Sequence, residues 1–147
     1  MYTPHVVTVF NVWEDSNLAI QMNITILRGV FLDTSRSDSV SQTGLSNTSR
    51  ATLFIPLDVR AEATTGVLKR YKPPKEFAAA TNKTNLWTLE SGGDGNSTAT
   101  YFARGDIKTP MTLAQLKANR DDVFDVTSVA IRDFGSEKMR HWMVSGR

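Results

Sequence analysis

A two-residue alternation of apolar and polar positions dominates the chain and predicts β-strands. In residues 20–26 every second position is apolar, so one face of the predicted strand can be buried. Residues 51–59 repeat the pattern. Pro56 within them predicts an edge strand or a bulge, because proline donates no ladder hydrogen bond. Residues 6–13 are apolar at both parities, as in a strand covered on both faces. Further strands are predicted at residues 86–90, 98–104, 123–134 and 139–144.

One predicted strand, residues 123–134, changes the phase of its alternation. The apolar residues move from even to odd numbers between Val126 and Val129. A β-bulge near Thr127 and Ser128 would keep both halves on the core face, and bulges are common where a strand bends around a barrel.

Helical signals are few. Thr112 is a suitable N-cap, and Gln115 completes a capping box for a helix that buries Leu113 and Leu116. A second short helical turn is predicted over residues 75–80, after two prolines. With about seven or eight strands, the pattern predicts an all-β fold: a small antiparallel β-barrel or sandwich with one or two short helices and long loops. We expect residues 1–147 to form one domain.

Two stretches lack these patterns and are predicted as loops. Residues 33–50 contain only Val40 and Leu45 as large apolar residues, so we expect a long flexible loop there. Either it is an unstructured insertion, or it becomes ordered on meeting a partner. In the second case the candidate docking residues are Arg36, Ser39, Val40, Gln42, Leu45 and Arg50. Residues 91–98 are glycine-rich and predict a hairpin tip.

Composition and charge exclude several classes of protein. The 147 residues include no cysteine, which excludes a disulfide scaffold, a thiolate zinc site and a cysteine nucleophile, and favours synthesis in a reducing cytoplasm. The 17 basic and 15 acidic residues give a net charge of +2, too balanced for a general nucleic-acid coat. No secretory signal is evident at residues 1–5, and no apolar stretch approaches the roughly 20 residues of a membrane span. We expect no membrane contact.

Catalytic motifs are absent from the sequence. The two histidines, His5 and His141, lie near opposite ends of the chain, without the spacing of a metal or triad motif. Asp121, Asp122 and Asp125 could bind a divalent cation, but aspartates are also ordinary at a helix-to-strand turn, which we favour. We therefore predict no catalytic residue, no metal and no cofactor, and a protein that is not an enzyme.

Basic residues gather in one segment, which we call the basic segment: Lys69, Arg70, Lys72 and Lys75. Such residues either form a solvated surface or contact DNA phosphates through a salt-dependent, sequence-independent attraction. Tyr71 is the single aromatic residue among them, so a stacking platform for single-stranded nucleic acid is not supported.

Several passages together are similar to a known family. The chain begins HVVTVFNVWEDSNLAIQMNITILRGVFL, continues through ATLFIPLDV, YKPPKEF and NLWTLESG, and ends DDVFDVTSVAIRDFGSEKMRHWMVSGR. This order resembles small structural proteins of tailed phages and prophages of Gram-positive bacteria, whose ending reads ITSVDxxDFGSxxMxHWEVxGK. The chain departs from that pattern at Met143, where an acidic residue is usual, and in the longer SGGDGNST insertion.

The resemblance implies a head–tail joining protein of the head-closure or stopper type, made in the host cytoplasm and located in the virion neck. Such a subunit would form a ring, a hexamer or dodecamer, between the portal–adaptor complex and the tail, with possible non-specific contact with packaged double-stranded DNA. A tail terminator or another minor capsid or tail protein is the alternative. A carbohydrate-binding β-sandwich that uses Trp13, Trp87 or Trp142 as a stacking platform is a further one.

Overall fold

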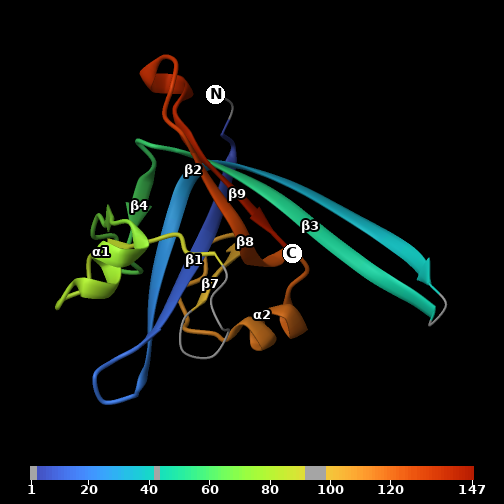
Figure 1. Ribbon diagram of the computed structural model, residues 1–147, viewed down its shortest axis with the longest axis horizontal. Coiled ribbons are helices and arrows are strands. Elements are labelled where there is room, and N and C mark those ends of the chain that lie inside the picture. Colours follow the sequence, from blue (N-terminus) through green and yellow to red (C-terminus); the bar gives the residue numbers. More distant parts are fainter. Residues whose placement is uncertain (1–2, 42–43, 92–98) are drawn as a thin grey trace.

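A closed antiparallel barrel forms the centre of the protein. The computed structural model describes residues 3–41, 44–91 and 99–147, with side chains except at residues 36–49 (Figure 1). Six strands follow one another around the barrel in the order β1–β7–β8–β9–β3–β2, and β2 pairs with β1 to close it. These strands are β1 (His5–Glu14), β2 (Ile20–Ser41), β3 (Gly44–Pro56), β7 (Ala99–Arg104), β8 (Val123–Arg132) and β9 (His141–Gly146).

Short elements decorate the barrel. Strand β4 (Arg60–Glu62) adds to the edge of β2, and β5 (Arg70–Tyr71) pairs in parallel with β6 (Leu86–Trp87) in a separate small sheet. The helical elements are α1 (Pro74–Ala79), α2 (Leu113–Asn119) and the 3-10 turn η1 (Glu137–Met139). The prediction of an all-β barrel with short helices is confirmed. In the described part of the chain, no helix has the length and apolarity that crossing a membrane requires.

Strand β1 is buried on both faces, as its sequence predicts. Val7 and Val9 belong to the barrel core, whereas Phe10 points to a second cluster beneath α2. In that second cluster Phe10 stacks on Tyr101, with ring centroids 5.1 Å apart, and Leu116 of α2 is fully buried. The two faces of β1 therefore hold the barrel and its covering helix together.

Local sequence signals explain several elements. The Thr112 hydroxyl accepts a hydrogen bond from the Gln115 backbone N–H, and the Gln115 side chain accepts one from the Thr112 N–H, so the predicted capping box is present. The predicted bulge in β8 is also present, between Val126 and Ser128. A second bulge lies in β2 at Gly29, whose φ of +89° is readily adopted by glycine.

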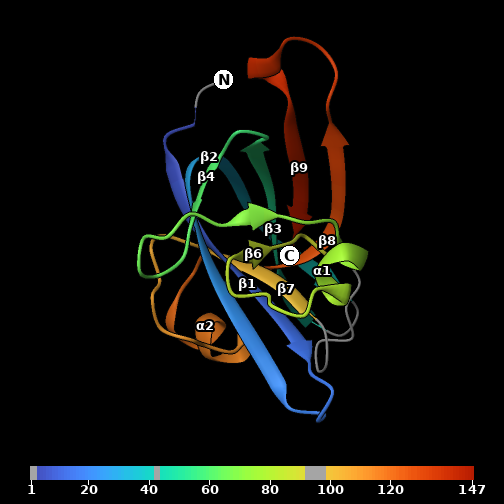
Figure 2. The same ribbon diagram turned by 90° about the vertical axis from the view of Figure 1, so that its left-hand side faces the viewer.

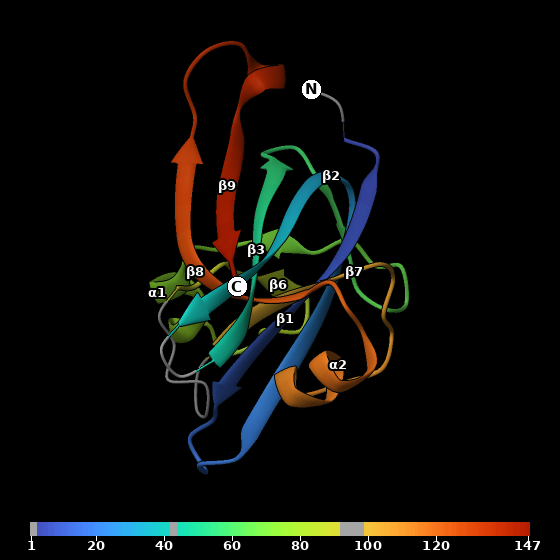
Figure 3. The same ribbon diagram turned by 90° about the vertical axis from the view of Figure 1, so that its right-hand side faces the viewer.

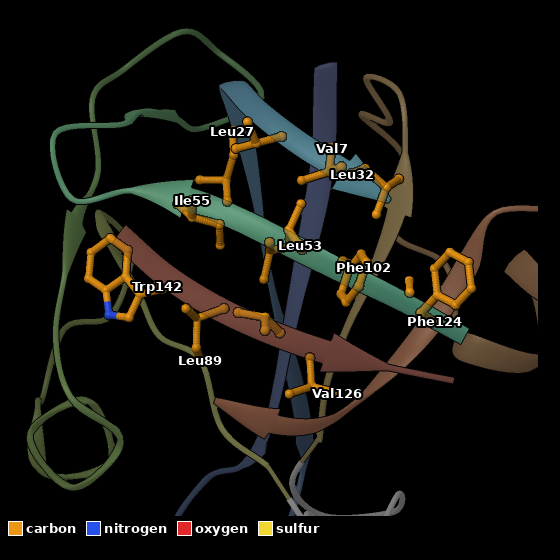
Figure 4. Packing of buried hydrophobic residues seen from close by; sticks show 14 of the residues in the cluster. Val7, Leu27, Leu32, Leu53, Ile55, Leu89, Phe102, Phe124, Val126 and Trp142 are labelled. Carbon is orange, nitrogen blue, oxygen red and sulfur yellow. The ribbon is translucent and has the colours of Figure 1, made fainter. Parts of the chain in front are cut away.

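The segment that contains β6 and the two residues after it folds over the barrel and contributes to its core. Trp87 packs edge-on against Trp142, with centroids 5.6 Å apart, and Leu89 lies in the same cluster (Figure 4). The buried side chain of Asn11 on β1 fixes this segment: its amide donates to the Thr88 carbonyl at 2.9 Å, and its carbonyl accepts from the Thr88 N–H at 3.2 Å. The Asn11 side chain thus bonds both backbone groups of Thr88, as a neighbouring strand would.

Two expectations need correction. Residues 33–50 do not form a loop in the described structure: residues 33–41 continue β2, residues 44–50 begin β3, and the two pair in antiparallel register. Backbone pairing orders this stretch, which has almost no apolar residues to bury. The strand that contains Pro56 is not an edge strand, because β3 lies between β2 and β9; Pro56 is its last residue and pairs with His141 only. The predicted glycine-rich tip at residues 91–98 lies, apart from Ser91, outside the described residues.

Candidate functional site

The extension of β2 and β3 beyond the barrel is the most prominent feature of the surface. We call residues 33–41 and 44–50 the arm. Strand β1 pairs with β2 only as far as Val30, and β9 pairs with β3 only from Ala51 onward. Within the described residues the strands of the arm therefore pair only with each other. Figure 1 shows the arm leaving the barrel as a two-stranded ribbon.

The arm contains five of the six predicted docking residues. Its register places Arg36 opposite Ser49, Ser39 opposite Ser46, and Val40 opposite Leu45. The two large apolar residues of the arm are thus cross-strand neighbours near its end, which the sequence alone did not indicate. Arg50 is exposed at the base of the arm, opposite Ser35, and Gln42 lies outside the described residues.

A second projection, the hairpin between β8 and β9, was not identified from the sequence. We call residues 131–140 the ribbon tip; Figure 2 shows it at the end of the barrel opposite the β1–β2 turn. Three large apolar side chains are exposed here: Ile131 at 54%, Phe134 at 70% and Met139 at 54%. The turn is internally bonded, since the Met139 N–H donates to the Ser136 carbonyl at 2.9 Å. Exposed apolar groups on an ordered turn are typical of a protein-binding surface.

The basic segment divides into two kinds of residue. Arg70 and Lys75 are exposed and Lys72 is half-buried, but Lys69 lies against the barrel. Its ammonium donates to the Thr25 hydroxyl at 2.8 Å and to the Ile24 carbonyl at 3.2 Å. Burial lowers the pKa of Lys69 to about 8. Lys69 therefore serves the fold, and the proposed contact with DNA has only the other three residues to use.

The lowered pKa of Lys69 predicts a stability that rises with pH. In an unfolded chain a lysine has a pKa of about 10.4, so between about pH 8 and 10 the folded protein binds fewer protons than the unfolded one and gains stability as the pH rises. Allowing for the partial exposure of the side chain, we expect the free energy of unfolding to rise by about 1 kcal/mol between pH 7 and 9.5. Urea unfolding of the wild type and of Lys69→Met at both pH values measures this increase in the free energy of unfolding. In the variant the increase should be absent.

The neighbouring Arg70→Met, at an exposed position, is the matched control and should keep the wild-type pH dependence. The range ends at pH 9.5 because burial raises the pKa of Tyr101 to about 12 and also raises that of Tyr71, so both tyrosines reduce stability at higher pH. An equal rise in Lys69→Met would assign the effect to another group.

The tryptophans do not form a common platform. Trp87 and Trp142 are 1% and 6% exposed and belong to the core, so neither can stack on a sugar. Trp13 is half-buried beside a surface hollow of about 580 Å³ that Glu14 and Lys83 also line. The Lys83 ammonium lies 5.6 Å from the Trp13 ring centroid, which occupies one face of that ring. A carbohydrate platform made of several tryptophans is therefore excluded.

The histidines and aspartates noted in the sequence have structural partners. The two histidines end a row of rings on neighbouring strands, with centroid separations of 5.5, 5.9 and 5.7 Å along His5, Phe31, Phe54 and His141. Asp122 forms an ion pair with Arg104 at 2.8 Å, and the backbone of Asp125 exchanges hydrogen bonds with that of Arg147. Across the described residues, no group of three or more His, Asp or Glu is arranged to hold a metal ion.

Comparison with known proteins places the whole chain in one family. The chain belongs to a family of unknown function (DUF6751), whose model matches residues 2–147. No curated protein and no solved structure matches the chain.

Proposed function

We propose that the protein is a structural subunit of the neck of a tailed phage, a head-closure or stopper ring protein between the portal–adaptor complex and the tail. The similarity of its sequence to small phage structural proteins motivates this proposal. The arm is the main structural support for the proposal, because a ribbon of paired strands that extends from a closed barrel is suited to contact neighbouring subunits.

The physical properties of the arm support an assembly role. An isolated two-stranded ribbon is marginally stable in water, and each of its outer edges presents unpaired backbone groups. The arm is rich in serine and threonine, with Val40 and Leu45 as its large apolar residues, so it gains little by burying side chains. It gains more from an additional strand supplied by a partner, and repetition around a ring multiplies such contacts.

The barrel supports the same role. A closed sheet holds the arm and the ribbon tip in fixed directions, and both project from the barrel. Ring proteins need rigid bodies with several distinct contact surfaces, one for each neighbour. The exposed Arg70 and Lys75 provide a modest positive charge that tolerates packaged DNA without binding it tightly.

Electron microscopy of purified protein mixed with portal-bearing, tailless heads tests the proposal. We expect a ring of density below the portal, and we expect the protein in mature virions by mass spectrometry. A ring found only on isolated tails would favour the tail-terminator alternative. Absence from mature particles would exclude the proposed function.

A further inference from the structure

The outer half of β8 is an exposed strand edge. Strand β8 pairs with β7 only over residues 123–125 and then with β9 over residues 126–132. Beyond the bulge, the described residues supply β8 with a partner on the β9 side alone, and Thr127, Ser128 and Ile131 are exposed. Figure 3 shows β9 between β8 and β3, with β8 at the rim. Such an edge accepts a further strand.

The same edge leads to the ribbon tip. Ile131 lies in the edge strand, and Phe134 and Met139 follow at its end. A partner strand laid along this edge could make backbone hydrogen bonds over residues 128–132 and bury apolar surface against Phe134 and Met139. The ideal partner is therefore a polar strand with large apolar residues near one end only.

The arm of a second copy has this composition. We infer that the β3 strand of one arm adds in antiparallel orientation to the β8 edge of the neighbouring subunit, an inference that rests on the proposed ring function. Residues 45–50 of the arm and residues 129–134 of the β8 edge are six positions each. When Leu45 is set opposite Phe134, Asn47 lies opposite Arg132 and Arg50 opposite Val129, so no like charges are opposed.

The position of the two surfaces favours a contact between subunits. The arm extends to the right in Figure 1 and toward the viewer in Figure 3, where the β8 edge faces left. One subunit thus presents its arm and its β8 edge in different directions. An interface that joins two different surfaces is heterologous, and repeated with a closing rotation it generates a ring.

Disulfide trapping tests this interface, because the chain has no cysteine of its own. We expect a Leu45→Cys, Phe134→Cys double variant, oxidised at high protein concentration and on portal-bearing heads, to give a ladder of covalent oligomers on non-reducing gels. Each single variant should give dimers at most, since one cysteine can join only two chains. The matched control is Leu45→Cys with Val67→Cys, because Val67 is also exposed, at 50%, but lies before β5.

A second variant tests the interface without cysteine. Phe134→Lys changes a side chain that is 70% exposed, so thermal unfolding should stay as in the wild type. Self-association measured by sedimentation velocity should weaken by about tenfold, as expected when an aromatic anchor is replaced by a charge. No ladder in either sample, or a ladder equal to that of the Val67 control, overturns the inference. If the double variant gives the ladder but the protein is absent from virions, the interface between subunits is supported and the proposed neck function is rejected.

Discussion

Replacing residues 36–49 with Asn-Gly is expected to leave the barrel folded and to abolish the joining of heads to tails. Ser35 and Arg50 are opposite each other in the arm, so a two-residue type I′ turn can connect them. The residues removed pair only with one another in the described structure, and the core pair Leu32 and Leu53 stays in place. We expect the free energy of unfolding to change by less than about 1 kcal/mol.

The measurement combines stability with assembly. Urea unfolding of the purified variant reports the barrel, while a phage that carries the same replacement is counted for tailed particles, free heads and retained DNA. The control is Leu18→Gly, at the exposed β1–β2 turn, where Leu18 has a φ of +62° that glycine adopts more readily. This control should assemble normally. Normal numbers of tailed, DNA-filled particles in the arm variant would show that the arm is dispensable.

The barrel could be predicted because its strands bury alternate residues. The alternation in β3 and the two apolar faces of β1 are consequences of burial, and burial is what a hydrophobic pattern records. The bulge at Thr127 and the capping box at Thr112 also have local signatures. These features depend on residues close together in sequence, so the sequence is sufficient for them.

The arm and the position of Lys69 could not be predicted in the same way. The strands of the arm have few apolar residues and therefore no alternating pattern, and their pairing continues the register that Leu32 and Leu53 set inside the barrel. Lys69 shares its sequence neighbourhood with exposed cations, and only the packing of its segment against β2 brings it to Thr25. The exposure of Phe134 follows from the direction of the β8–β9 hairpin, which no local pattern encodes.

Gly146→Ala is expected to cause the largest loss of stability for the smallest change. Gly146 ends β9 at the seam where β8 turns from β7 toward β9. A Cβ added there would lie 2.9 Å from the Phe124 Cβ, 3.1 Å from the Asp125 carbonyl oxygen and 3.1 Å from Phe102 Cε1. The Asp125 oxygen is a backbone atom, and the Phe124 Cβ is bonded directly to the backbone. Both atoms can therefore move only if β8 moves.

Overpacking of this kind costs about 1–3 kcal/mol, which for a protein of this size lowers the Tm by about 2–4 °C per kcal/mol. Ser145→Ala is the matched control, because Ser145 is the adjacent, half-buried residue of the same strand and loses atoms instead of gaining them. Thermal unfolding of both variants checks the prediction. If Gly146→Ala and Ser145→Ala have equal Tm values, β8 and β9 separate easily at this seam. An easily opened seam would also weaken the case for a rigid β8 edge, because an added strand needs a fixed edge to pair with.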